Sequence, residues 1–264
     1  MKIGIIGLGF VGQAINEFFK SKKQNVLIYD KYKNINTFDI VLSTDIIYIC
    51  LPTLYSNSTK TYDMTDIDST IEELVKNKYN GVILIKSTVL PNYCTTTNNK
   101  YPQLMIVHNP EFLSTRTASH DFSQQYHIVL GYTKQSIIVI EITEEFYRNL
   151  FPTAEISCVI SEEAGLMKLA CNSFYAMKIQ YFTEIFLLCE KMGISYNCVK
   201  NLMLKNNWIN SMHTSIPGHD NIISFGGACF PKDINALNEF MKLRDTPSCV
   251  IESVINERNS MRDD

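Results

Sequence analysis

The chain opens with Met-Lys-Ile-Gly-Ile-Ile-Gly-Leu-Gly-Phe-Val-Gly (residues 1–12), an apolar run that leads directly into three spaced glycines. Gly7, Gly9 and Gly12 form the pattern G-x-G-x-x-G. The segments around it supply the context that this pattern needs, a strand before it (2–6) and an amphipathic helix after it (10–21). The opening stretch therefore predicts a strand–turn–helix unit that binds a dinucleotide.

Each residue of this turn has a separate physical role in such a unit. Gly7 permits the tight turn, Gly9 lets the backbone approach a pyrophosphate, and Gly12 lets the helix pack closely on the sheet. Phe10 and Val11 stand at the positive end of the helix, where a pyrophosphate is stabilised. The second strand (26–29) ends at Asp30, 18 residues after Gly12. An acidic residue there accepts both ribose hydroxyls and repels a 2′-phosphate, so NAD is favoured over NADP, although the neighbouring Lys31 argues mildly the other way.

Short apolar runs alternate with amphipathic segments through the first 150 residues or so, which predicts a parallel sheet covered on both faces by helices. The predicted strands are residues 2–6, 26–29, 46–51, 82–86, 104–107, 127–130 and 156–159. The predicted helices between them include residues 10–21, 67–78 and 135–150. This part of the chain, residues 1–160, is expected to be a Rossmann-type domain.

Residues 161–192 break this alternation and predict one long helix. The segment holds no proline, Ser161 is placed to cap its start and Gly193 to end it. A helix of that length extends ~48 Å at ~1.5 Å per residue, and apolar residues cover much of its circumference. A second copy of the chain is the simplest partner that buries such a surface, so we expect a homodimer through 161–192. Residues 161–264 are expected to form an all-helical domain.

Composition excludes several other classes of protein. The 264 residues carry a net charge of −3, which gives no reason to expect nucleic acid or an anionic membrane as partner. No stretch approaches the ~18 apolar residues of a membrane span, and the start is too short for a signal peptide, so we expect a cytoplasmic protein. The eight cysteines include no C-x-x-C pair and no zinc-ligand spacing, so no metal is expected.

Lys168 and Asn172 are the polar residues that stand out on the long helix. Their i,i+4 spacing places them on one face, and a buried ammonium needs a partner. They face either a cleft or solvent at the helix edge.

Further residues suited to catalysis lie close together in one stretch, Gly226-Gly227-Ala228-Cys229-Phe230-Pro231-Lys232-Asp233. The two glycines permit close approach of a ligand, and Pro231 suits the first position of a helix over 232–242. Cys229 is then expected just before a helix N-terminus, with Lys232 within about one turn. Both features favour a thiolate, so Cys229 is predicted to be a nucleophile.

Two more polar segments follow predicted strands, Lys86-Ser87-Thr88 and His108-Asn109-Pro110-Glu111-Phe112-Leu113. Ligands gather beyond the carboxyl ends of strands in such sheets, so Thr88 and Glu111 are expected near a nicotinamide. Taken alone, both residues fit helix caps or turns equally well.

These segments together resemble the UDP-glucose/GDP-mannose dehydrogenase family, over nearly the whole chain from Met1 to about Asn259. The resemblance rests on five motifs in order: 7–12 with Asp30, 86–89, 109–113, Lys168-x-x-x-Asn172 and 225–233.

The resemblance implies a four-electron oxidation in which two NAD molecules in succession take a sugar C6 alcohol to a carboxylate. Lys168 and Asn172 would stabilise the oxyanions. Cys229 would form a thiohemiacetal and then a thioester. Candidates to position or deprotonate the hydrolytic water are Glu111, Thr88 and Asp233. The further residues expected to contact the nucleotide-sugar substrate are Phe112, Leu113, Phe225, Gly226 and Gly227; Thr88 and Lys232 are expected to contact NAD.

The sequence departs from the family pattern in three places. The sequence stops where the family's usual second α/β domain is expected to begin, Ser114-Thr115 replaces Arg-Glu, and residues 209–213 contain no arginine. These departures suggest a different or weakly held substrate, a companion chain that supplies the domain, or lost activity.

Two other functions fit parts of the pattern. A two-electron β-hydroxyacid-type dehydrogenase shares the Rossmann domain and the Lys-x-x-x-Asn pair but has no need for Cys229. A non-catalytic NAD-binding or dimerisation protein would keep the fold without turnover. One NADH per substrate would indicate the former, and NAD binding without turnover the latter.

Overall fold

The computed structural model describes all of residues 1–264, and the chain divides into two compact units. The N-terminal unit comprises Met1–Leu54 and Tyr62–Lys168, and the C-terminal unit comprises Tyr55–Thr61 and Leu169–Asp264. The boundary falls inside the long helix α6 (Ser161–Met192), between Lys168 and Leu169.

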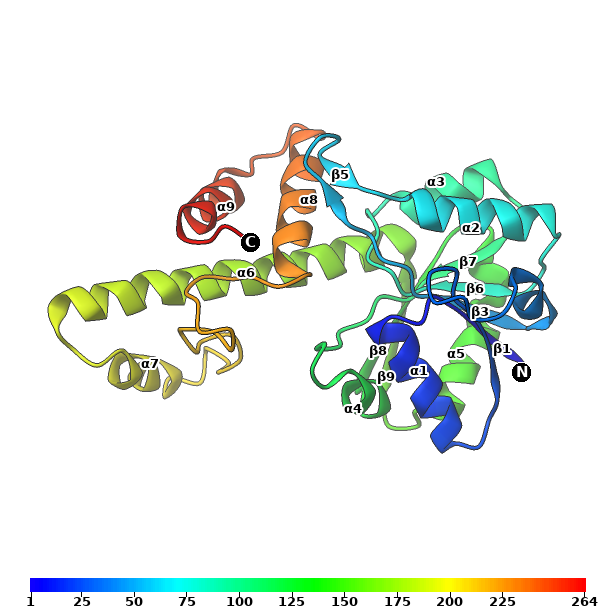
Figure 1. The fold of residues 1–264 in the computed structure, drawn as a ribbon, viewed down its shortest axis with the longest axis horizontal. Helices are drawn as coiled ribbons and strands as arrows, with labels where there is room; N and C mark the ends of the chain where they lie inside the picture. Colours follow the sequence, from blue (N-terminus) through cyan, green and yellow to red (C-terminus); the bar gives the residue numbers. More distant parts are fainter. The chain divides into compact units, whose positions relative to one another are not determined.

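A seven-stranded sheet forms the centre of the N-terminal unit (Figure 1). From one edge to the other its strands are β2 (Val26–Tyr29), β1 (Ile3–Ile6), β3 (Ile46–Ile49), β6 (Val82–Ile85), β7 (Met105–His108), β8 (His127–Tyr132) and β9 (Glu155–Ile160). The first five are mutually parallel, β8 pairs antiparallel with β7, and β9 runs parallel to β8. The Rossmann-type sheet is confirmed, but it is mixed rather than wholly parallel.

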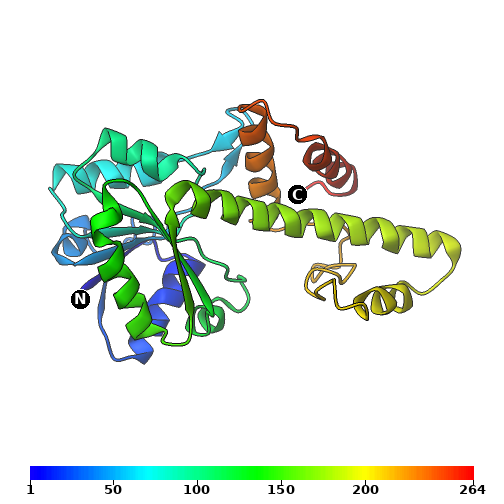
Figure 2. The ribbon, with the colours of Figure 1, turned by 180° about the vertical axis from the view of Figure 1, so that it is seen from behind.

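Helices cover both faces of this sheet, as the apolar strands require (Figure 1). One face packs on α1 (Phe10–Ser21), α4 (Ala118–Ser123) and α5 (Ile140–Leu150), and the other on α2 (Thr65–Lys76) and α3 (Tyr93–Lys100). Two short 3-10 helices, η1 (Phe38–Ser43) and η2 (Ser136–Val139), complete the unit. Strand side chains alternate between the two cores: Ile3 and Ile5 of β1 face α1, whereas Ile6 lies in the core against α2. Figure 2 shows the same layers from behind.

The C-terminal unit is built on the rest of α6, with α7 (Tyr196–Leu204), α8 (Phe230–Lys242) and α9 (Cys249–Met261). Two small cores hold it together, one around Phe225 and Ile234 and the other around Phe182 and Tyr196. A hairpin of β4 (Tyr55–Ser56) and β5 (Thr61–Tyr62) adds a non-helical element, since β4 contacts α8. The long helix is confirmed, while the expected all-helical domain is supplemented by this hairpin.

The start and end of α6 follow from its sequence. The helix begins at Ser161, with Glu162 and Glu163 in the first turn, and ends at Met192 before Gly193. Gly193 adopts φ +66°, a left-handed conformation that glycine reaches without strain. Neither this helix nor any other is apolar over a sufficient length to cross a bilayer.

Candidate functional site

The structure gives a different reason for the absence of a side chain at each of the three glycines of the opening turn. Gly7 has φ +89°, and a Cβ there would lie 2.7 Å from the carbonyl oxygen of Cys50. A Cβ on Gly12 would lie 2.0 Å from the carbonyl oxygen of Gly7, so α1 reaches β1 only because this side chain is absent. A Cβ on Gly9 would meet nothing within 4 Å. Internal packing therefore explains Gly7 and Gly12, whereas Gly9 faces open space at the N-terminus of α1, as a pyrophosphate site requires.

Asp30 closes the same site from the end of β2 and is 8% exposed. Its Oδ2 accepts a hydrogen bond from the amide of Leu8 at 2.7 Å, and its Oδ1 accepts one from the amide of Lys33 at 2.8 Å. The Nζ of Lys33 donates to the carbonyl oxygen of Leu8 at 2.6 Å. Asp30 and Lys33 thus fix the two peptide units on either side of the Leu8 Cα, a role that the spacing of Asp30 did not reveal. Phe10 and Val11 begin α1 beside this turn, with Phe10 37% exposed.

The carboxyl ends of β6 and β7 hold a buried polar group around Asn109. Lys86, only 3% exposed, donates from Nζ to the Oδ1 of Asn109 at 3.0 Å, and the hydroxyl of Tyr147 donates to the same oxygen. Asn109 in turn donates from Nδ2 to the carbonyl oxygen of Val129 at 2.8 Å. Burial lowers the pKa of Lys86 to about 8, with the charge of Glu111 acting in the opposite direction. Lys86 and Asn109 belong to two separate sequence motifs, and their hydrogen bond to each other is not visible in the sequence.

Thr88 follows this group in a less buried position. Its carbonyl oxygen accepts a hydrogen bond from the hydroxyl of Thr53 at 2.7 Å, while Ser87 donates to the carbonyl oxygen of Leu51 at 2.7 Å. The loop after β6 is therefore anchored to the loop after β3, which fixes the position of Thr88.

Glu111 and Lys168 form a buried pair in the N-terminal unit. The Lys168 Nζ lies 2.5 Å from the Glu111 carbonyl oxygen and 3.6 Å from its Oε1, and the two side chains are 6% and 9% exposed. The Glu111 Oε2 accepts a hydrogen bond from the amide of Leu113 at 2.6 Å. Phe112 places its ring centroid 5.2 Å from the same ammonium and is 42% exposed. The ammonium is thus held between a carboxylate and an aromatic face, with Phe112 open to solvent.

A second buried cluster lies in the C-terminal unit, where Asn172 of α6 meets α8. The Asn172 Nδ2 donates to the Asp233 Oδ2 at 2.6 Å, and the Lys232 Nζ lies 2.6 Å from the Asp233 Oδ1. Asp233 is fully buried and Asn172 is 5% exposed. Both oxygens of this carboxylate are therefore engaged, which fixes the amide of Asn172 and the ammonium of Lys232.

Cys229 occupies the N-cap position of α8, and Pro231 lies in the first turn. The helix begins at Phe230, two residues before the predicted start. Cys229 is half-buried, so its thiol is neither sealed in the core nor fully in solvent. The residue that follows, Phe230, packs edge-on against Tyr175 and His213, whose rings stack with centroids 4.7 Å apart. Phe225 is buried in the core, Gly226 is half-buried and Gly227 is exposed with φ +80°.

The candidate residues thus fall into separate groups, each inside one unit. The N-terminal unit brings together Glu111, Phe112, Leu113 and Lys168, and separately the glycine turn with Asp30. The C-terminal unit brings together Asn172, Lys232 and Asp233 beside the turn that carries Cys229. Helix α6 carries Lys168 and Asn172 one turn apart, as their spacing predicts.

Comparison with known proteins identifies both units. A model of the NAD-binding domain of the UDP-glucose/GDP-mannose dehydrogenase family matches residues 32–151, and a model of that family's central domain matches residues 162–260. A UDP-glucose 6-dehydrogenase of Rickettsia bellii is 35% identical over 180 residues, which are 66% of this chain and 40% of that protein. One from Rhizobium meliloti is 27% identical over 225 residues, 81% of this chain and 50% of that protein. The chain thus spans half or less of the length of these relatives.

A solved structure shows the same fold. The UDP-glucose dehydrogenase from the archaeon Pyrobaculum islandicum superposes with a TM-score of 0.83 at 20% identity, over 98% of this chain and 68% of that one. The two family models together cover well over half of the sequence and correspond to the sheet-bearing part and the helical part. The chain therefore belongs to the UDP-glucose/GDP-mannose dehydrogenase family, and its N-terminal unit is an NAD-binding domain of that family.

Proposed function

We propose that the protein is an NAD-dependent nucleotide-sugar 6-dehydrogenase that oxidises a sugar C6 alcohol to the carboxylate through Cys229. The observation that carries this proposal is the position of Cys229 at the N-cap of α8, four residues before the buried Asp233, which holds both Asn172 and Lys232. A two-electron dehydrogenase has no use for a half-buried thiol at a helix N-terminus. A thiol there is suited to nucleophilic attack, because the helix end favours the thiolate.

NAD, when bound at the glycine turn, supplies the hydride acceptor for each of the two oxidation steps. The chain provides an open surface at Gly9 for its pyrophosphate and the carboxylate of Asp30 for its ribose. The hydrogen bond from Leu8 to Asp30 holds the turn in shape before any ligand arrives, which lowers the entropic cost of binding.

The roles of the other side chains follow from their chemistry. Lys168 and Asn172 are donors on adjacent turns of α6 and would stabilise an alkoxide or a later oxyanion. The thiolate of Cys229 would add to the aldehyde carbon to give a thiohemiacetal. Loss of a hydride from that carbon gives a thioester. Water then cleaves the C–S bond, which returns the thiolate and releases the carboxylate and two protons.

Glu111, Thr88 and Asp233 remain the candidates for handling the hydrolytic water. Among them, Glu111 has its Oε1 3.6 Å from the Lys168 ammonium, which is longer than a hydrogen bond, and its Oε2 on the amide of Leu113, whereas each oxygen of Asp233 accepts a hydrogen bond at 2.6 Å. We therefore favour Glu111 as the group that accepts a proton from water and Asp233 as the group that orients Asn172. Phe112, Leu113 and Gly227 are proposed to contact the substrate. Phe225 is buried in the core and Gly226 lies against the guanidinium of Arg262, so these two residues are proposed to shape the loop instead.

The partner that we propose is a second copy of the chain, bound through α6. Phe174, Tyr181 and Leu188 recur at seven-residue intervals on one face of this helix and are 59%, 50% and 54% exposed. Three large apolar side chains in such a row are typical of a helix that packs against another helix.

A turnover screen tests the proposed function. The purified chain is incubated with NAD and, in turn, with UDP-glucose, UDP-N-acetyl sugars, GDP-mannose and simple hydroxyacids. NADH formation is followed by absorbance. We expect NADH formation with at least one of these sugars and none with simple hydroxyacids. NADH formed from hydroxyacids alone, or NAD binding without turnover of any of these substrates, contradicts the proposal.

A further inference from the structure

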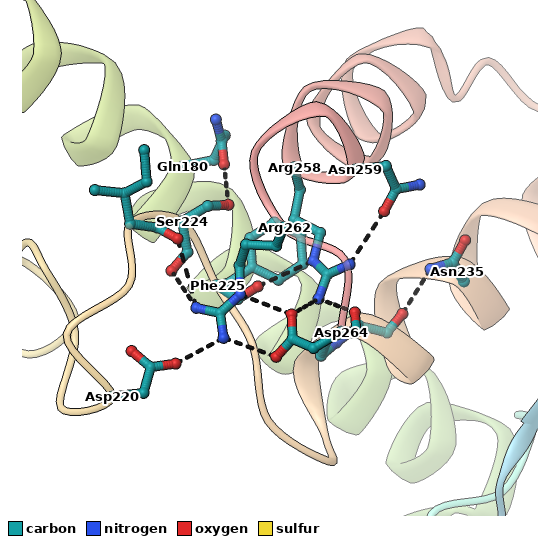
Figure 3. Close-up of polar contacts among 11 residues, drawn as sticks. Gln180, Asp220, Ser224, Phe225, Asn235, Arg258, Asn259, Arg262 and Asp264 are labelled. Carbon is teal, nitrogen blue, oxygen red and sulfur yellow. Dashed lines mark hydrogen bonds and ion pairs between the residues drawn. The ribbon is translucent and has the colours of Figure 1, made fainter.

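Two arginines of the C-terminal unit lie against the loop that leads to Cys229. Arg258 belongs to α9 and Arg262 follows its last turn, and they are 6% and 7% exposed. Figure 3 shows both guanidinium groups turned toward Ser224 and Phe225, which precede Gly226 and Gly227. Two buried arginines need acceptors, and the loop supplies them.

The two arginines donate hydrogen bonds to successive main-chain carbonyl groups of this loop. Arg258 donates from Nε to the carbonyl oxygen of Phe225 at 3.1 Å. Arg262 donates from Nη1 to the carbonyl oxygens of Ile223 and Ser224 at 3.4 and 3.5 Å. Three consecutive peptide groups are thereby attached to one helix end (Figure 3). In a trans peptide the N–H points away from the carbonyl, so this attachment also sets the direction of the following amides.

Carboxylates hold the two arginines in place. Asp264 accepts from the Arg258 Nη2 at 2.5 Å and from the Arg262 Nε and Nη2 at 2.8 and 2.7 Å. Asp220 accepts from the Arg262 Nη2 at 2.6 Å. These bonds lower the pKa of both aspartates. Paired, planar guanidinium groups keep a fixed orientation, which a single ammonium in their place would not.

The other side of the loop is attached to α6. The amide of Ser224 donates to the hydroxyl of Thr183 at 3.1 Å, and the hydroxyl of Ser224 donates to Gln180. Gln180 and Thr183 are fully buried. The loop is therefore held between α6 and the two arginines.

Gly226 fits the shape of this arrangement. A Cβ there would lie 2.2 Å from the Arg262 Nη2, 2.4 Å from its Cζ and 2.9 Å from the Asp264 Oδ2. A Cβ on Gly227 would meet nothing within 4 Å. The two adjacent glycines therefore have different surroundings. The guanidinium of Arg262 excludes a side chain at Gly226, whereas a side chain at Gly227 would meet open space.

We propose that Arg258 and Arg262 are positioning residues that hold residues 223–228 in the shape that presents Cys229, and that Gly226 is required by Arg262 rather than by a ligand. The inference rests on the proposed role of Cys229, but the arrangement itself needs no substrate. Arg258 and Arg262 act through the loop and not on the reacting atoms.

The first test measures the protection of the loop from exchange and the reactivity of Cys229, and it does not depend on enzymatic turnover. Arg258→Gln and Arg262→Gln are compared with Arg244→Gln, at an exposed arginine two residues after α8 whose side chain donates to the carbonyl oxygen of Phe240. Hydrogen–deuterium exchange of the peptide spanning 223–229 is expected to rise at least about fivefold in the first two and to stay unchanged in the control. The alkylation rate of Cys229 by iodoacetamide, resolved by peptide mass spectrometry, is expected to change at least about threefold. Wild-type exchange and alkylation in both variants would overturn the proposal.

A double-mutant cycle tests the claim about Gly226. Gly226→Ala is expected to raise exchange of the loop in the wild-type background and to add little in an Arg262→Ala background, where the clashing group is gone. Additive effects would overturn the claim. Arg262→Lys keeps the charge and serves as a milder variant in case Arg262→Ala fails to fold. We expect it to show an intermediate rise in exchange, because one ammonium cannot bind all five acceptor oxygens of the Arg262 guanidinium.

Activity provides a separate readout. In the Arg262 variants we expect kcat to fall at least about tenfold, while the KM for NAD stays unchanged because NAD is held by the N-terminal unit. Because a smaller folded fraction would also lower the apparent kcat without changing the KM for NAD, kcat is expressed per folded chain, measured by circular dichroism. An Arg262 variant whose kcat per folded chain equals that of the wild type would overturn the positioning role. Absence of turnover in the wild-type chain would contradict the proposed function, and exchange and alkylation would still decide the role of the arginines.

Discussion

The ammonium of Lys168 lies 3.6 Å from the Oε1 of Glu111 inside the N-terminal unit, with both side chains less than a tenth exposed. At this burial neither charge is well solvated, so each depends on the other. The same pairing in a solvent-exposed place, between Lys100 and Glu72 at 3.3 Å, leaves both groups hydrated. The two pairs therefore differ in burial rather than in contact distance.

Lys168→Met is expected to lower the free energy of unfolding by about 3 kcal/mol, because it leaves the Glu111 carboxylate buried without its cation. Lys100→Met is the matched control and should leave the free energy of unfolding unchanged within error, because exposed pairs contribute little. Urea unfolding at pH 7.5 measures both. Adding Glu111→Gln to Lys168→Met should recover part of the loss. Equal effects of the two lysine substitutions would contradict the account of the buried pair.

His108 should make the fold sensitive to acid. Burial lowers its pKa from 6.5 to about 4, and the charges of Lys86 and Lys168 act in the same direction. Between these values the unfolded chain binds a proton that the folded chain does not. The stability that the neutral imidazole provides is therefore complete above pH 6.5 and is lost as the pH falls through about 4. The expected loss is up to about 1.4 kcal/mol per pH unit in this window.

The measurement is urea unfolding at several pH values between 7.5 and 4. We expect His108→Gln to show a shallower decline than the wild-type chain, whereas His120→Gln, at an exposed position on α4, should follow the wild type. Parallel curves for wild type and His108→Gln would refute this assignment.

The glycine turn offers a test that separates ligand binding from folding. Gly9→Ala adds a Cβ in open space at φ −70°, so the fold should keep its stability while the affinity for NAD, measured by calorimetry, falls at least about tenfold. Gly12→Ala places a Cβ 2.0 Å from the Gly7 carbonyl oxygen and should destabilise the domain by about 3 kcal/mol. If Gly9→Ala binds NAD as tightly as the wild type, the pyrophosphate does not lie on this turn.

The proposed dimer depends on the exposed row of α6. Tyr181→Glu introduces a charge in the middle of this row and should shift the protein from dimer to monomer in sedimentation equilibrium. Ile142→Glu, on an equally exposed residue of α5, should leave the dimer intact. A monomeric wild-type chain, or dimers of equal affinity in both variants, would show that this row does not mediate self-association.

Much of the fold could be predicted because its elements carry strong local signals. The four residues of β1 are all buried, so the strand appears as an uninterrupted apolar run, and α6 has a polar start at Ser161 and a glycine at 193. The direction of β8 could not be predicted, because a buried apolar run has the same composition in either orientation. The contact of β4 with α8 was also missed, since Tyr55 and Ser56 form a two-residue strand without a pattern.

The site could be predicted only in part for a related reason. The sequence singles out Lys168, Asn172, Glu111 and Asp233 as candidates because they belong to compact motifs. Their pairings, Lys168 with Glu111 and Asn172 with Asp233, join residues far apart in the sequence. The partners that fix the site are scattered single residues. Arg258 acts on Phe225 across 33 positions, and Lys33 contacts Leu8 across 25, so no local pattern connects them.

The number of NADH molecules formed per sugar consumed tests the central claim most directly. With limiting substrate and excess NAD, the account predicts two NADH per sugar, a carboxylate product and an acid-trapped thioester on the Cys229 peptide. Cys229→Ser should yield no carboxylate, while Cys249→Ser, at an exposed cysteine, should behave as wild type. One NADH per sugar, at a rate unaffected by Cys229→Ser, would contradict it.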